Sequence, residues 1–220
     1  MKKICVWVLL CVNCLFANQE IDATLEVVKK FGNLPNILVQ YSGKDYNQKE
    51  YTLRIFKMLV ADLKVTGHFT VQEDGNIANE MVLNFDEYRK AKIDLIARVS
   101  AEILQDGLVV NLQLYDANSG TLALSKEYKN SRAETYPFLA HKLAIDINDY
   151  IQAPNVDWME RIVVVSYYTK PGESEILLSD YTLTYKNSLI KGGLNIFPKW
   201  ANEQQNAFYY TKYLDKPTLF

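Results

Sequence analysis

The order of apolar and polar residues divides the chain into two kinds of segment. In the first kind, every second residue is apolar or a short run is continuously apolar, which is typical of β-strands. In the second kind, apolar residues recur at helical spacing. Before residue 152, strand patterns occupy 21–27, 36–41, 68–72, 93–103, 108–115 and 121–129. Helix patterns occupy 45–66 and 134–151, and the ambiguous stretch 76–90 contains a short helical pattern at 86–90.

The longest helix pattern, 45–66, has recognisable signals at both ends. Asp45 followed by Gln48 forms a capping-box pattern. Gly67 suits the left-handed conformation that commonly ends a helix. The apolar stripe between them consists of Ile55, Phe56, Leu59, Val60 and Leu63. This stripe predicts that one face of the helix packs into a core.

The strands between residues 93 and 129 are separated by short turn sequences. Asp106 with Gly107, and the stretch 118–120, are turn signals between alternating strands. Asp74 with Gly75 predicts a further turn after strand 68–72. Helices and strands are mixed and include an antiparallel run, so we predict a mixed α/β (α+β) N-terminal domain over residues 18–152.

The pattern changes beyond a linker at 153–160. Four short strand patterns follow, at 162–168, 175–178, 186–190 and 206–210, with no helix pattern among them. Their length and content suit one four-stranded blade of a β-propeller. One repeat leaves an apolar face uncovered. We therefore expect residues 161–220 to form a first, truncated blade of an incomplete β-propeller, and the chain to be the front part of a longer protein.

The first 17 residues have the three parts of a secretory signal peptide. Lys2 and Lys3 precede an uncharged apolar run at 4–16, and Ala17 closes it. The run is too short for a bilayer, which needs about 20 apolar residues. All three cysteines lie within it, so the mature chain would have no disulfides. We expect a bacterial periplasmic protein without stable membrane insertion.

Composition and motifs exclude several classes of function. The formal net charge is −2, and the chain lacks the basic stripe that nucleic-acid binding requires. The two histidines, His68 and His141, are isolated in sequence, so we expect structural roles and no metal site. No serine lies in a nucleophile-elbow motif. We therefore expect neither a cofactor nor catalysis, although acidic residues are scattered along the chain at Asp45, Asp62, Asp86, Glu87 and Asp94.

Several short segments, taken in order, carry a family resemblance. In the mixed domain they are VADL at 60–63, TGHF at 66–69, the strand 94–99 and the meander that ends at 115–116. Beyond the linker they are RIVVV at 161–165, LSDY at 178–181, PKWA at 198–201 and AFYY at 207–210. Together with the signal peptide and the linker, this order resembles the TolB family, the periplasmic propeller proteins of the Tol–Pal cell-envelope system. The stretch 201–204 departs from the family pattern, because it lacks the Pro-Asp-Gly of the family's blade turn.

The resemblance implies a scaffold function with two protein partners. In this family the propeller docks the lipoprotein Pal, and the mature N-terminus binds the inner-membrane protein TolA. The chain would then be a non-enzymatic periplasmic protein that supports envelope integrity and cell division, and that associates with the outer membrane peripherally through Pal. The blades expected to carry most of the Pal-docking surface are not in this sequence, so no residues are assigned to that surface.

The segment 18–30 occupies the family's TolA-binding position. Its alternating residues are Ile21, Asp22, Ala23, Thr24, Leu25, Glu26 and Val27. An extended segment of this kind can add as a strand to the edge of a partner's sheet. It can equally belong to the sheet of its own domain, and the sequence leaves both interpretations open.

A second hypothesis takes the protein as a periplasmic hydrolase or a carbohydrate-binding protein. Its sites would lie in a cleft between the two domains, where paired carboxylates could act on a glycosidic bond. The aromatic content and the scattered acidic residues motivate it. Trp158 and Trp200 are expected instead to pack, the first at the domain junction and the second in the blade.

Overall fold

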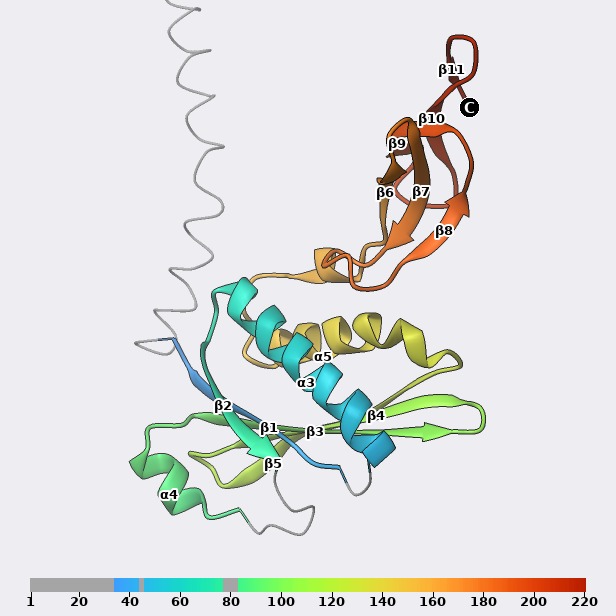
Figure 1. Ribbon diagram of the computed structural model, residues 1–220. Coiled ribbons are helices and arrows are strands. Elements are labelled where there is room, and N and C mark those ends of the chain that lie inside the picture. The colour runs from blue at the N-terminus through green and yellow to red at the C-terminus, as the bar shows by residue number, and fades with distance from the viewer. Residues whose placement is uncertain (1–33, 44–45, 77–82) are drawn as a thin grey trace, which may run out of the picture.

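The computed structural model describes residues 34–43, 46–76 and 83–220 (Figure 1). The predicted signal peptide, the strand at 21–27 and the helix cap at Asp45 lie outside these residues. None of the helices in the described ranges is long and apolar enough to cross a membrane.

The N-terminal region is built on a five-stranded mixed sheet with the order β2-β1-β3-β4-β5. Strand β1 (Asn36–Tyr41) lies between β2 (Thr70–Asn76) and β3 (Leu95–Leu104) and is parallel to both. Strands β3, β4 (Gly107–Asp116) and β5 (Thr121–Asn130) form an antiparallel meander. The predicted mixed α/β domain is therefore confirmed in its elements, and the crossover between β1 and β2 is the long helix.

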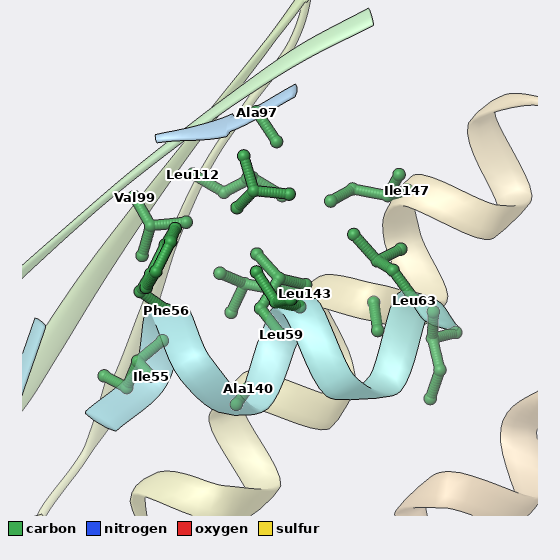
Figure 2. Close-up of a cluster of buried hydrophobic side chains, with 14 of the residues drawn as sticks. Ile55, Phe56, Leu59, Leu63, Ala97, Val99, Leu112, Ala140, Leu143 and Ile147 are labelled. Carbon is green, nitrogen blue, oxygen red and sulfur yellow. The ribbon is translucent and has the colours of Figure 1, made fainter. Parts of the chain in front are cut away.

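Two helices cover one face of this sheet, namely α3 (Tyr46–Thr66) and α5 (Tyr136–Tyr150) (Figure 1). A short 3₁₀ helix, Ala133–Thr135, precedes α5. Figure 2 shows Leu59 and Leu63 of α3 beside Leu143 and Ile147 of α5, close to side chains from β3 and β4. The predicted apolar stripe of α3 is buried in full. Helix α3 ends where expected, since Gly67 has a left-handed φ of 70°.

A short helix, α4 (Phe85–Lys90), is associated with a second, smaller apolar cluster. Ile93, Ile96 and Ala117 are buried there, with Phe85 and Tyr88 of α4 packed against them. The helical pattern at 86–90 thus corresponds to a real helix. The turn predicted at Asp74 and Gly75 is wrong, because both residues lie within β2, which continues to Asn76. The pairing of β2 with β1 outweighs the turn preference of these two residues.

The C-terminal region consists of two three-stranded antiparallel sheets. After a 3₁₀ helix (Asp157–Glu160), β6 (Val163–Lys170), β7 (Glu173–Ser179) and β8 (Asn187–Ile190) form the first sheet. The second sheet has the order β11-β10-β9 and is formed by β9 (Leu194–Trp200), β10 (Phe208–Tyr213) and β11 (Pro217–Leu219). The single four-stranded sheet predicted from sequence is therefore wrong in strand number and in arrangement.

Two features account for the missed strands. Strand β9 contains Pro198, which cannot donate to a strand ladder and so argued against a strand. Strand β11 has only three residues. Gly192 and Gly193, with φ values of 76° and 77°, form the turn that leads directly into β9.

The two C-terminal sheets are joined by a buried pair of polar residues. The backbone N–H of Asn195 donates to Ser174 Oγ at 2.8 Å, and Asn195 Nδ2 donates to the backbone oxygen of Ser174 at 2.7 Å. The backbone N–H of Ser174 donates to the Gly193 oxygen at 3.0 Å. These bonds link the first residues of β7 with the start of β9, so the two sheets form one structural unit.

Candidate interdomain site

The helix layer lies between the five-stranded sheet and the C-terminal sheets (Figure 1). On the N-terminal side the junction is formed by α3 and α5. On the C-terminal side it is formed by the turn that follows β7. Tyr181, in this turn, packs against the core cluster of the N-terminal domain. The junction therefore joins three segments that are far apart in sequence.

His141 of α5 lies at the centre of this junction, between two carboxylates. Its Nδ1 is 2.7 Å from Asp62 Oδ2, and its Nε2 is 3.2 Å from Asp180 Oδ2. Asp62 comes from α3 and Asp180 from the turn after β7. All three side chains are completely buried. A buried ion pair stabilises a fold only when its remaining polar atoms are also bonded, so the other partners of the carboxylates matter.

The turn after β7 folds around the carboxylate of Asp180. The backbone N–H of Tyr185 donates to Oδ1 at 2.6 Å, and the backbone N–H of Thr182 donates to Oδ2 at 2.9 Å. The Thr182 hydroxyl also donates to Oδ2. Such local bonds are what aspartate typically makes in turns. The turn thus satisfies Asp180 on one side and presents its charge to His141 on the other.

Asp62 has a second partner from the C-terminal region. The hydroxyl of Tyr181 donates to Asp62 Oδ1, while His141 occupies Oδ2. The ring of Tyr181 lies 4.7 Å from the His141 ring and 5.0 Å from that of Trp158, centroid to centroid. The expected place of Trp158 at the domain junction is confirmed. The apolar rings shield the charged groups from water.

The protonation of these groups follows from their surroundings. Burial by itself lowers the pKa of His141, but the hydrogen bonds to Asp180 and Asp62 and their charges outweigh it and raise the pKa above its ordinary 6.5. Burial acts to raise the pKa of Asp180, yet its bonds to His141, Thr182 and Tyr185 hold that pKa well below the ordinary value. Burial and the adjacent Asp62 raise the pKa of the Tyr181 hydroxyl. An imidazolium flanked by two carboxylates is the state that these shifts favour.

A second polar connection fixes the start of the linker. His68 Nδ1 lies 2.7 Å from Asn148 Oδ1, and Asn148 Nδ2 donates to the backbone oxygen of Pro154 at 2.8 Å. His68 and Asn148 are both buried. The first residues beyond α5 are therefore attached to the N-terminal domain. Both histidines have structural partners, as the sequence predicts.

This arrangement is suited to holding two domains together. An aspartate–histidine pair occurs in hydrolases, but there it activates a nucleophile that substrate can reach. Here His141 has both ring nitrogens bonded to carboxylates and no exposed surface. Among the described residues, no group of three or more histidine, cysteine, aspartate or glutamate side chains is placed to bind a metal ion.

The residues singled out from the sequence lie in different parts of the molecule. The candidate TolA-binding residues, Ile21 to Val27, lie outside the described residues. Asp86 and Glu87 are exposed on α4, whereas Asp94 accepts a bond from the backbone of Asn36. Of the scattered acids that the structure describes, Asp62 alone joins the junction. Sequence reasoning missed Asp180 altogether, although it lies within the quoted segment 178–181.

Residues 23–123 match the TolB amino-terminal domain. The Tol-Pal system protein TolB of Wolinella succinogenes is 55% identical over 219 residues, which is 99% of this chain and 51% of that protein. The chain belongs to the TolB family. TolB of Helicobacter hepaticus is 45% identical over 90% of this chain and 47% of its own length. The chain thus spans about half the length of these TolB relatives.

A solved structure agrees with this assignment at the level of fold. The crystal structure of TolB from Acinetobacter baumannii superposes with a TM-score of 0.61 at 16% sequence identity. The similarity covers 85% of this chain and 46% of that one. It extends beyond the amino-terminal domain, because residues 23–123 are less than half of the chain. The C-terminal sheets are therefore part of a TolB-like fold.

Proposed function

We propose that this chain forms the front part of a non-enzymatic periplasmic scaffold that links TolA at the inner membrane to Pal at the outer membrane. The observation that carries the proposal is the 55% identity to a Tol-Pal system protein TolB across 99% of the chain. The scaffold would support envelope integrity and cell division. Residues 161–220, with their two three-stranded sheets, would form the start of a β-propeller.

The TolA-binding part would be the segment 18–30. The alternation of Ile21, Ala23, Leu25 and Val27 with polar residues suits a strand that adds to a partner's sheet edge. In such a strand the backbone supplies hydrogen bonds, and alternate side chains enter pockets of the partner. Charge and apolar contact would then lie on opposite faces of the bound segment.

The test is binding of purified TolA to the chain with and without residues 18–30, measured by isothermal titration calorimetry. We expect the deletion to abolish binding and to leave the circular dichroism spectrum of the folded domains intact. A finer pair of variants separates the two faces of the segment. Replacing Ile21, Leu25 and Val27 by serine should abolish binding, whereas replacing Asp22, Thr24 and Glu26 by alanine should weaken it less. Undiminished binding by the deleted chain would refute the assignment of this segment.

A hydrolase or carbohydrate-binding function in an interdomain cleft has less support. The carboxylates at the junction, Asp62 and Asp180, are completely buried and bonded to His141. A substrate would have to displace Tyr181 and the turn after β7 to reach them. No observation on the described residues favours this second function.

A further inference from the structure

The bonding at His141 depends on one proton. An uncharged imidazole has a single N–H and can donate to only one of two carboxylates. Here both ring nitrogens face a carboxylate oxygen, at 2.7 Å and 3.2 Å. Only the protonated ring can donate to both at once. The bond to Asp62 lies within the N-terminal domain, whereas the bond to Asp180 crosses to the C-terminal region.

We propose that His141 acts as a proton-dependent lock that holds the C-terminal sheets against the helix layer of the N-terminal domain. With the proton bound, the ring bridges α3 and the turn after β7. Without it, two buried carboxylates face a ring that can serve one of them, and the unpaired charge is costly to keep out of water. Separation of the two parts then becomes favourable, because it rehydrates Asp180. This inference concerns the movement of the two parts and does not depend on the proposed partners.

Other charged and titratable groups around the ring support this single-proton behaviour. Asp62 faces it from α3, and Asp180 and Tyr181 face it from the turn after β7. Farther out, Tyr185 and Tyr136 lie close to Asp180. Burial raises the pKa of the Tyr136 and Tyr181 hydroxyls above the ordinary tyrosine value, so both stay protonated where a histidine titrates. His141, whose pKa lies above its ordinary 6.5, is therefore the group in this cluster that loses its proton as the pH rises above that value.

A pivot between the two parts would lie at the connection that follows the 3₁₀ helix. Asn148 binds the oxygen of Pro154 and thereby keeps the first linker residues on the N-terminal domain. Val156 and Met159 are buried in the core cluster of that domain, so the 3₁₀ helix is attached to it as well, and the free connection is the one from Arg161 into β6. Aromatic contacts at Trp158 and Phe138 would have to loosen for the parts to separate. The bond between His141 and Asp180 thus lies beyond the tethered linker. Its loss can therefore change the orientation of the C-terminal sheets as a whole.

The first half of the test measures the proton directly. The chain has only two histidines, so ¹⁵N-histidine labelling gives two sets of ring signals, and a His68→Gln variant assigns them. We expect the two ring nitrogens of His141 to show imidazolium shifts at pH 6.5 and to titrate at a higher pH. A His141 ring that is already neutral at pH 6.5 would overturn the proposal.

The second half measures the distance between the two parts over the same pH range. Spin labels at Lys57→Cys on α3 and Lys199→Cys on β9 use exposed positions, in a chain whose Cys5, Cys11 and Cys14 are replaced by serine. We expect one narrow distance distribution below the His141 midpoint, and a broader or shifted one above it. A distribution that stays unchanged through the titration would show a static bridge and overturn the lock.

A matched pair of variants ties the movement to this residue. Asp180→Asn keeps the shape of the side chain but removes its charge, so it should lower the His141 midpoint by about 1–3 pH units. It should also abolish the pH-dependent change in distance, because no buried charge at residue 180 is left to rehydrate. Asp157→Asn, an exposed aspartate in the 3₁₀ helix at the same junction, should leave the His141 midpoint and the change in distance unaltered. Equal midpoints for the two variants would refute the role of Asp180 as the partner in the lock.

Discussion

The hydroxyl of Tyr181 donates a hydrogen bond to Asp62, 119 positions earlier in the chain. It is one of two bonds by which the C-terminal region reaches the buried charges of the helix layer; the other joins Asp180 to His141. The ring of Tyr181 packs at the same time against Trp158 and His141. One side chain therefore supplies both apolar contact and a polar anchor at the junction.

Removing only the hydroxyl tests the polar anchor. Tyr181→Phe keeps the ring but leaves Oδ1 of Asp62 without this donor in a buried site. We expect a loss of about 1–3 kcal/mol in the free energy of unfolding, the usual cost of an unsatisfied buried group. Tyr168→Phe is the matched control, because Tyr168 is 64% exposed, and it should change stability by less than about 0.5 kcal/mol. Urea denaturation of both variants makes the comparison, and equal stabilities would contradict the anchor.

Asn148 should contribute more to the stability of the fold than a typical asparagine on a helix. Its amide bridges His68 and the oxygen of Pro154, so Asn148→Ala leaves a buried ring and a half-buried carbonyl oxygen without this partner. We expect a loss of about 2–4 kcal/mol, from two bonds at about 1–2 kcal/mol each. Asn187→Ala, at an exposed position in β8, serves as the control. Amide hydrogen exchange gives a second reading, since faster exchange at residues 153–156 in the Asn148 variant would show that the linker is released.

The core between α3 and α5 gives a prediction about packing. Leu59 is completely buried and lies beside Leu143 (Figure 2). Leu59→Ala should cost about 2–5 kcal/mol, because it removes buried methyl groups and leaves a cavity. Lys57→Ala, two positions earlier on the exposed side of α3, should be nearly neutral. Thermal and urea unfolding both test this, and a neutral Leu59 variant would mean that the helix layer repacks freely.

Much of the N-terminal domain could be predicted from the sequence because its signals are local. The stripe of α3, with Leu59 at its centre, repeats at helical spacing and is buried as expected. The meander follows from alternation and turn residues such as Gly107 and Gly120. Strand β9 was not predicted because Pro198 interrupts its pattern. Its place in a sheet is decided by pairing with β10. By contrast, the parallel pairing of β1 with β3 joins residues far apart in sequence, such as Ile37 and Leu95, and such pairing leaves no local signal.

The interdomain site could not be predicted, because its charges meet only in the fold. His141 is 79 positions from Asp62 and 39 from Asp180. One signal was present in each helix, however. Asp62 lies three positions after Leu59, on the apolar face of α3, and His141 lies among Ala140, Leu143 and Ala144 on the apolar face of α5. A carboxylate and an imidazole on two buried faces need partners, and each could have been proposed for the other.

The pH dependence of stability follows from the opposite pKa shifts of His141 and Asp180. A raised histidine pKa contributes stability in full below 6.5, and this contribution is lost as the pH rises from 6.5 through the folded-state pKa. A lowered aspartate pKa contributes stability above 3.8, and this contribution is lost as the pH falls from 3.8 through the folded-state pKa. The junction should therefore be strongest between pH 3.8 and 6.5. Above 6.5 the free energy of unfolding should fall by about 1.4 kcal/mol per pH unit until the folded-state pKa is passed.

Asp180→Asn should be less stable than the native chain at pH 6 and should lose stability over a narrower pH range, because its histidine has one carboxylate partner fewer. Urea denaturation at half-unit pH steps compares the two curves, with Asp157→Asn as the control, and parallel curves for the native chain and the Asp180 variant would show that this pair does not set the alkaline limit.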